Sequence, residues 1–228
     1  MKLSISMTRR ETILGWAYLF INLFVLPVLL DMGNALLAAP LSETQLNLVY
    51  FALNFLLVLA IFHRFLRYSL TLALKSPWRC LRFAAAAFVL YYLAMMVISQ
   101  GILYVQPEFV NVNDSAIMDM TGEQYTLMSV ATVFLVPVTE ETLYRGLLFR
   151  GLHEKSRLLA YSASTIVFSG IHVISYVGLY DWVTLLLCFV QYLPAGLALA
   201  WAYEKADTII APILVHITVN QIGISAMR

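Results

Sequence analysis

Long apolar runs dominate this chain and constrain its fold more than any other feature. Stretches of about 20 apolar residues, the length of a membrane-crossing helix, recur along its 228 residues, of which 61% are hydrophobic and 12% charged. Backbone amides inside a bilayer must be satisfied within the chain, and the alternating pattern of a membrane barrel is not visible. The sequence therefore predicts an all-α, multi-pass membrane helix bundle.

The runs predict about seven spans in a single membrane domain, residues 1–228. We expect the spans at about residues 13–30, 46–66, 81–105, 125–149, 158–177, 182–203 and 208–226. Residues 1–124 then hold the first three spans and an acidic connection, and residues 125–228 form a catalytic core of four spans. We expect that connection, residues 106–123, to be a solvated loop.

The charged residues predict an orientation. Lys and Arg collect on the cytoplasmic side of membrane proteins. Reading the N-terminus as cytoplasmic places nearly all of the 14 basic residues in connections on that side, apart from Arg145 within a span and the terminal Arg228. The connections on the other side carry acidic residues: Asp31, Glu43, Glu108, Asp114, Asp119, Glu123 and Asp181. We expect a cytoplasmic N-terminus, a cell-membrane location if the source is bacterial, and no nucleic-acid partner, because no long basic tract is present.

Two adjacent carboxylates and an arginine interrupt the fourth run. Glu141 and Arg145 are one helical turn apart in the favourable acid-before-base order, so each lowers the cost of burying the other. Glu140 points about 100° away from Glu141, and the residue one turn after it is Tyr144, so it is the unpaired carboxylate. Pro137 can open the helix just before it. Ionisable groups at membrane depth usually mark a functional site.

Two later spans carry polar residues one turn apart. Phe168 and His172 share a face of the fifth span, and His216 and Asn220 share a face of the seventh. A histidine in a membrane helix can serve either an interhelical hydrogen bond or a function. Because several such groups occur together with Glu140 in one small protein, we expect a shared site.

These groups suit hydrolysis. A carboxylate beside a histidine can take a proton from water and deliver it to a leaving amine. An asparagine amide and a second histidine can donate hydrogen bonds to an oxyanion, each contributing typically about 3 kcal/mol. Glu140, His172 and His216 could equally form a three-ligand zinc site with a position open for water.

The three motifs together resemble a known family. In order, and each within an apolar run, they read Glu140-Glu141-x-x-x-Arg145, Phe168-x-x-x-His172 and His216-x-x-x-Asn220. Over residues 125–226 this pattern resembles that of the CPBP family, the CAAX proteases and bacteriocin-processing proteins, also called Abi. The resemblance implies an intramembrane endopeptidase of the glutamate type, often labelled a metalloprotease.

The resemblance also implies roles for single residues. Glu140 and His172 would activate water, and His216 and Asn220 would stabilise the oxyanion. Supporting roles fall to Glu141, Arg145 and Phe168. The family's better-studied members favour a mechanism without a required cofactor, and zinc held by Glu140, His172 and His216 is the alternative.

Partners and access follow from the same comparison. We expect a peptide or protein substrate at or in the bilayer, lipidated or not. Family members usually have about eight spans and this chain ends soon after Asn220, so an oligomer or a lipid could complete the cavity. Glu140 is predicted to lie about 22 Å from the outer end of its span, and His172 about 20 Å from the inner end of its own span. These distances place the two residues at different depths in the membrane. We expect entry from the cytoplasmic side.

Two other classes of function remain open. The chain could be a non-catalytic immunity or binding protein on the same fold. It could also be a small proton-coupled transporter that uses Glu140 and the histidines as a relay. The intact Asn220 and the unpaired Glu140 favour the enzyme.

Overall fold

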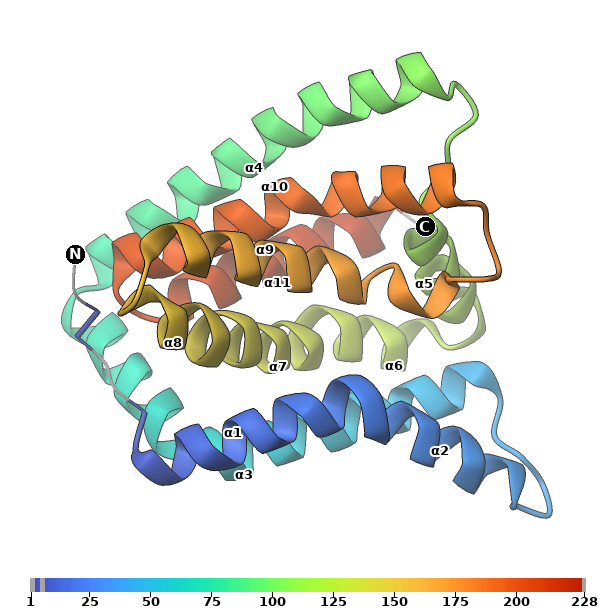
Figure 1. Cartoon of the computed structure of the whole chain (residues 1–228), viewed down its shortest axis with the longest axis horizontal. Helices are drawn as coiled ribbons and strands as arrows, with labels where there is room; N and C mark the ends of the chain where they lie inside the picture. The colour runs from blue at the N-terminus through green and yellow to red at the C-terminus, as the bar shows by residue number, and fades with distance from the viewer. Residues whose placement is uncertain (1–2, 5–6, 227–228) are drawn as a thin grey trace.

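The computed structural model describes residues 3–4 and 7–226, and every regular element within them is a helix. The helices run side by side in alternating directions (Figure 1). The first half comprises α1 (Arg9–Phe20), the π-helical stretch η1 (Ile21–Val25), α2 (Leu26–Ala35), α3 (Glu43–Lys75) and α4 (Pro77–Val105). The second half comprises α5 (Val112–Glu123), α6 (Tyr125–Val130), the π-helical η2 (Ala131–Leu135), α7 (Val136–Glu141), the π-helical η3 (Thr142–Phe149), α8 (Arg150–His153), α9 (Arg157–Ile171), the 3-10 turn η4 (Ile174–Tyr176), α10 (Trp182–Ala206) and α11 (Ile210–Ala226). Lys2 and Arg228, which enter the charge argument, lie outside the described residues.

The predicted fold class, an all-α bundle of several membrane helices, is confirmed. Among the described residues, five continuous helices are long and apolar enough to cross a membrane: Arg9–Ala35, Glu43–Lys75, Pro77–Val105, Tyr125–His153 and Trp182–Ala206. The other two predicted spans correspond to α9 and α11, which have 15 and 17 residues. At 1.5 Å per residue they reach only about 22 and 25 Å, less than the roughly 30 Å of a hydrocarbon core.

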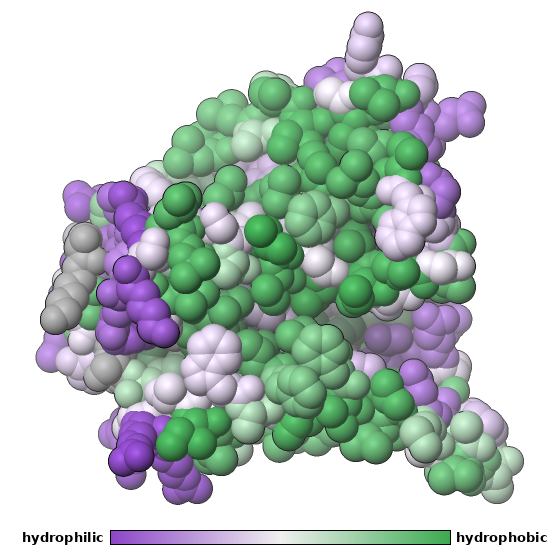
Figure 2. Space-filling view, in the orientation of Figure 1, coloured by the Kyte–Doolittle hydropathy of each residue, from purple (hydrophilic) through white to green (hydrophobic). Residues whose placement is uncertain are grey.

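The surface fits a protein embedded in lipid. Figure 2 shows a broad hydrophobic surface between hydrophilic ends. Large apolar side chains on several helices are exposed, for example Phe24, Leu56, Val97 and Leu186, each at about 60% or more. A contiguous apolar surface of this extent marks a membrane contact rather than a surface in water. The chain is therefore an integral membrane protein.

Capping explains why helices begin earlier than the apolar runs. The Thr8 side chain accepts a hydrogen bond from the Glu11 N–H, and the Glu11 carboxylate accepts one from the Thr8 N–H. Ser42 and Gln45 form the same reciprocal arrangement before α3. Such capping boxes satisfy amide groups that the first helical turn leaves unpaired. The first two membrane helices consequently extend beyond their predicted starts.

The acidic connection is not the solvated loop that we expected. Its last two thirds form α5, whose first turn is capped by the Asn111 side chain. The Asn111 side chain accepts hydrogen bonds from the N–H groups of Asn113 and Asp114. Val112 and Met120 of this helix are buried. Figure 1 shows α5 lying across one end of the bundle, behind the ends of α10 and α11. The connection therefore packs as part of the fold.

Close approach of α9 and α10 requires a glycine. A Cβ added to Gly196 would lie 2.7 Å from Thr165 Cγ2 and 3.0 Å from Thr165 Cα. We expect Gly196→Ala to lower the free energy of unfolding by about 1–3 kcal/mol, since the backbone of α9 would have to move. Thermal unfolding in detergent measures this loss. Gly101→Ala on α4 is the control, because its added Cβ meets nothing within 4 Å; equal effects of the two changes would contradict the prediction.

Candidate active site

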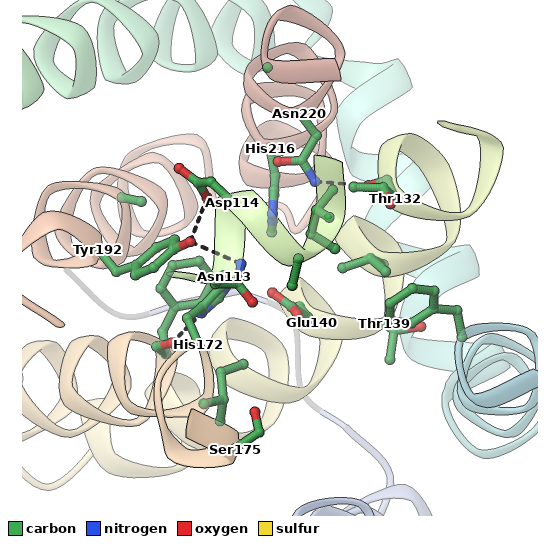
Figure 3. A pocket seen from close by; sticks show the side chains of 18 of the residues that line it. Asn113, Asp114, Thr132, Thr139, Glu140, His172, Ser175, Tyr192, His216 and Asn220 are labelled. Atoms are coloured by element: carbon green, nitrogen blue, oxygen red, sulfur yellow. Dashed lines mark hydrogen bonds between the residues drawn. The ribbon is translucent and has the colours of Figure 1, made fainter. Parts of the chain in front are cut away.

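One large cavity lies among the helices and contacts all three motifs. Its volume is about 960 Å³, and α3, α4, α5, α7, α10 and α11 all contribute to its wall. Glu140, His172, His216 and Asn220 line this same cavity (Figure 3). The structure thus brings together the four residues that we expected to be catalytic. Their catalytic roles stay a prediction.

The fully buried Glu141 and Arg145 form the ion pair that their spacing predicts. Arg145 Nη1 donates to Glu141 Oε1 at 3.0 Å, and both side chains are 0% exposed. Arg145 Nη2 also donates to the Gly196 carbonyl at 3.3 Å, and the guanidinium carbon lies 4.2 Å from the centre of the Phe168 ring. The sequence did not indicate that His216 Nδ1 lies 2.8 Å from the same Glu141 oxygen. Glu141 therefore joins the first motif to the third.

Glu140 differs from its neighbour in having no such partner. Its Oε2 atom is buried and makes no hydrogen bond to any described residue. Figure 3 shows its carboxylate among the side chains that surround the cavity. Consecutive helical residues point about 100° apart, which explains how Glu141 faces the packed core while Glu140 faces the cavity.

His172 lies at the end of α9 and not within a span. The helix ends at Ile171, earlier than the predicted residue 177, and His172 is its C-cap. The His172 Nδ1 atom lies 2.7 Å from the Phe168 carbonyl oxygen. Because a carbonyl can only accept, Nδ1 carries the proton, and the neutral ring keeps its lone pair on Nε2. The ring also stacks on Tyr192, with centroids 4.1 Å apart and an interplanar angle of 25°.

Asn220 binds a carbonyl that a proline leaves free. In the π-helical stretch η2 the Val136 N–H bonds to the Ala131 carbonyl, five residues back. The next residue, Pro137, has no N–H to offer the Thr132 carbonyl in that pattern. Asn220 Nδ2 donates to that Thr132 oxygen at 2.8 Å instead. Pro137 thus changes the helix as expected, and α11 supplies the missing donor.

The predicted conflict in depth is wrong. The fourth membrane helix continues to His153, beyond the predicted residue 149, and α9 begins at Arg157. Counted from these ends, Glu140 lies about 20 Å and His172 about 22 Å into the bundle at 1.5 Å per residue. The two residues are therefore at matching depth.

The cavity is not lined by the described residues of the basic end, and the expected entry from the cytoplasmic side stays a prediction. Asp31, Glu43 and Asp114 line the cavity, and no Lys or Arg of the described residues does. At the basic end the buried Glu204 carboxylate accepts hydrogen bonds from Arg157 and Tyr161 and so ties α9 to α10. The cavity consequently extends toward the acidic end of the bundle.

Sequence reasoning missed several residues of the wall, chiefly Asn113, Asp114 and Tyr192. The Tyr192 hydroxyl donates to Asp114 Oδ1 at 2.8 Å and accepts from Asn113 Nδ2 at 2.9 Å. Burial raises the pKa of the Asp114 carboxyl, and the hydrogen bond from Tyr192 opposes that rise. The run Asn111-Val112-Asn113-Asp114 has the composition of a helix cap, which is the one signal that could have identified α5.

The side chains proposed as zinc ligands do not cluster in this structure, and metal dependence stays a prediction. Among the described residues, no group of three or more His, Cys, Asp or Glu side chains is placed to hold a metal ion. The Nδ1 atoms of His172 and His216 already lie against Phe168 and Glu141, respectively. Glu140, His172 and His216 share the cavity without forming a ligand cluster.

The comparison with protein families agrees with this arrangement. Residues 122–222 match the family model described as type II CAAX prenyl endopeptidase Rce1-like. This segment is similar to the Rce1-like family, and the match covers less than half of the chain. It contains all three motifs and runs from the end of α5 into α11, so the resemblance to the CPBP family is confirmed over these residues.

Similarity outside that model is limited. The UPF0177 protein YxdF of Lactococcus lactis subsp. lactis (strain IL1403) is 27% identical over 117 residues, which are 51% of this chain and 59% of that protein. The chain thus spans less than two thirds of this curated relative. No solved structure matches the chain.

Proposed function

We propose that the Rce1-like segment is a CAAX-protease-like intramembrane endopeptidase that hydrolyses a peptide bond with a water activated by Glu140 and His172. The observation that carries this proposal is that a carboxylate without a hydrogen-bond partner on Oε2 and a histidine with its Nε2 lone pair available line one cavity. A base and a hydrogen-bond acceptor around one water are what general base catalysis requires.

In the proposed reaction, Glu140 accepts a proton from water while the water oxygen bonds to the carbonyl carbon of the peptide. His172 Nε2 accepts the second hydrogen bond of that water and orients it. The electron pair of the C=O double bond moves to the oxygen and forms the oxyanion of a tetrahedral intermediate. When the C–N bond breaks, the proton held by Glu140 passes to the leaving amine.

We assign oxyanion stabilisation to Asn220 and His216. The Asn220 amide has two N–H groups, and the bond to the Thr132 carbonyl uses one of them. His216 directs Nδ1 at the Glu141 carboxylate, so it can donate from Nε2 only as the doubly protonated imidazolium. The same Glu141 oxygen also accepts from Arg145. Glu141 and Arg145 thus support the site through His216.

The cavity wall suits an apolar, membrane-associated substrate. Leu143, Phe168, Ile171 and Leu199 line it together with several tyrosines. Its volume falls within the range of sites that enclose a drug-sized ligand, so it can hold a few side chains of a peptide or part of a lipid chain. We propose a peptide or protein substrate within or at the bilayer, lipidated or unmodified, and a reaction that needs no cofactor.

Cleavage by the purified protein in detergent tests this proposal. The substrates are fluorogenic peptides, half of them carrying a lipid anchor, incubated with and without a chelator while elemental analysis measures bound metal. We expect cleavage that persists in chelator and disappears in His172→Ala. Cleavage that is lost on chelation and restored by zinc would contradict the metal-free mechanism, and equal cleavage by wild type and His172→Ala would contradict the assignment of the site.

A further inference from the structure

The tightest ring contact at the candidate site is between His172 and Tyr192 of α10. Their centroids lie 4.1 Å apart at an interplanar angle of 25°, closer and more parallel than the Phe168–His172 contact at 4.8 Å and 53°. Both rings line the cavity. Since His172 caps the end of α9, where no further helical turn surrounds it, the Tyr192 face limits rotation of the imidazole about its ring torsion.

The Tyr192 hydroxyl is itself held from two sides. A phenol hydroxyl can donate one hydrogen bond and can also accept. Here it donates to Asp114 and accepts from Asn113. Figure 3 shows both bonds converging on the hydroxyl from α5. The position of the Tyr192 ring is therefore determined by the first turn of α5 as well as by α10.

That first turn is in turn attached to α10. The Asn111 side chain caps α5 through its oxygen, which accepts from the Asn113 and Asp114 N–H groups, and donates through Nδ2 to Gln191 Oε1 at 2.7 Å. Gln191 directly precedes Tyr192. Two consecutive residues of α10 thus bind the same helical turn, about 80 residues earlier in the chain.

We infer that Tyr192 is a positioning residue that holds the His172 ring in its reactive orientation, and that the first turn of α5 holds Tyr192. The inference rests on the proposed function, because it assigns a purpose to the orientation of His172. Tyr192 acts on the histidine and not on the reacting atoms, so its loss lowers the rate of the chemical step more than the binding of substrate.

The kinetic test uses variants that remove the ring, the hydroxyl or the acceptor. We expect Tyr192→Leu to lower kcat about 10- to 100-fold with KM within about twofold, since loss of alignment acts on the bound state. Tyr192→Phe keeps the stack and loses only the hydrogen bonds of the hydroxyl, including a long one to Asn111 Oδ1 at 3.5 Å, so we expect a smaller loss of about two- to tenfold. Asp114→Ala should match Tyr192→Phe, while Asp114→Asn, which retains an oxygen acceptor, should restore most of the rate.

A matched control is Tyr180→Leu. Its ring contacts Tyr176, and it is not among the residues that line the cavity. We expect wild-type kcat from this variant. A raised KM with unchanged kcat in Tyr192→Leu would identify Tyr192 as a substrate-binding wall and overturn the inference.

A second measurement separates this inference from the proposed function. Nitrogen-15 chemical shifts of histidine-labelled protein report which ring nitrogen of His172 carries the proton, with His172→Ala giving the assignment. We expect a single Nδ1–H form in wild type and Tyr192→Phe, and exchange with the Nε2–H form in Tyr192→Leu. An unchanged His172 signal in Tyr192→Leu would overturn the inference even if cleavage is confirmed. Wild-type protein that cleaves no peptide would count against the proposed function alone.

Discussion

Glu140→Gln is expected to lower the rate of peptide cleavage by about 100- to 10,000-fold, the range that general acid–base groups contribute. The glutamine amide has nearly the same shape as the carboxylate and cannot accept the proton of water. Because Glu140 Oε2 has no hydrogen-bond partner among the described residues, the substitution removes no bond from that atom. We therefore expect the unfolding temperature to stay at the wild-type value. Initial rates in detergent and thermal unfolding of the same preparation measure both quantities.

Glu154→Gln is the matched control for this experiment. It lies in the loop after α8, its side chain is 65% exposed, and its pair with Arg150 spans 3.5 Å. Arg150 is buried, but the Glu154 carboxylate is mostly in solvent. We expect such a solvated partner to contribute at most about 1 kcal/mol, so activity and stability should both remain. Full activity in Glu140→Gln would remove Glu140 from the mechanism.

Arg145→Met is expected to cost about 3–5 kcal/mol of unfolding free energy, the largest stability effect that the structure predicts. Removing one partner of a buried ion pair leaves the other as an uncompensated charge. Here the remaining partner is Glu141, which is fully buried and has His216 Nδ1 beside it. Methionine fills the space against Phe168 but replaces neither the pair nor the bond to the Gly196 carbonyl. Thermal or denaturant unfolding in detergent measures the loss.

A second substitution tests whether charge burial is the cause. Arg145→Met combined with Glu141→Gln removes both charges of the pair and retains an oxygen that can accept from His216. We expect the double variant to regain part of the stability that the single variant loses. The exposed Arg67→Met, away from this network, should change stability by no more than about 0.5 kcal/mol. A double variant less stable than Arg145→Met would show that the charge of Glu141 is not the source of the loss.

Local spacing predicted the features that lie within one helix. Glu141 pairs with Arg145 because they are one helical turn apart, and the Glu140 side chain points in another direction because it is one residue away. Neither prediction needed knowledge of the neighbouring helices. The effect of Pro137 on its helix was likewise predictable from the residue alone, because proline lacks the N–H of a helical hydrogen bond. The apolar runs determined the helical class for the same reason, since a backbone in lipid must satisfy its own amides.

The ends of the helices were harder to predict from the sequence. Residues 172–177 continue the apolar run of α9, yet the helix stops at Ile171 and His172 turns toward Tyr192. Hydropathy reports the lipid-facing character of a segment and not its hydrogen bonding. The same limit explains why the sequence predicted a loop at residues 106–123, although residues 112–123 pack as α5.

The sequence by itself determined that this chain is a membrane bundle and that it carries four polar residues suited to hydrolysis. Only the tertiary structure decided how those residues meet: His216 reaches Glu141 across 75 residues, Asn220 reaches Thr132 across 88, and the cavity extends toward the acidic end. The physical reason is that such contacts depend on the angle, depth and ends of separate helices. These quantities arise from the packing of side chains between helices, and the spacing of residues along a single helix does not reveal them.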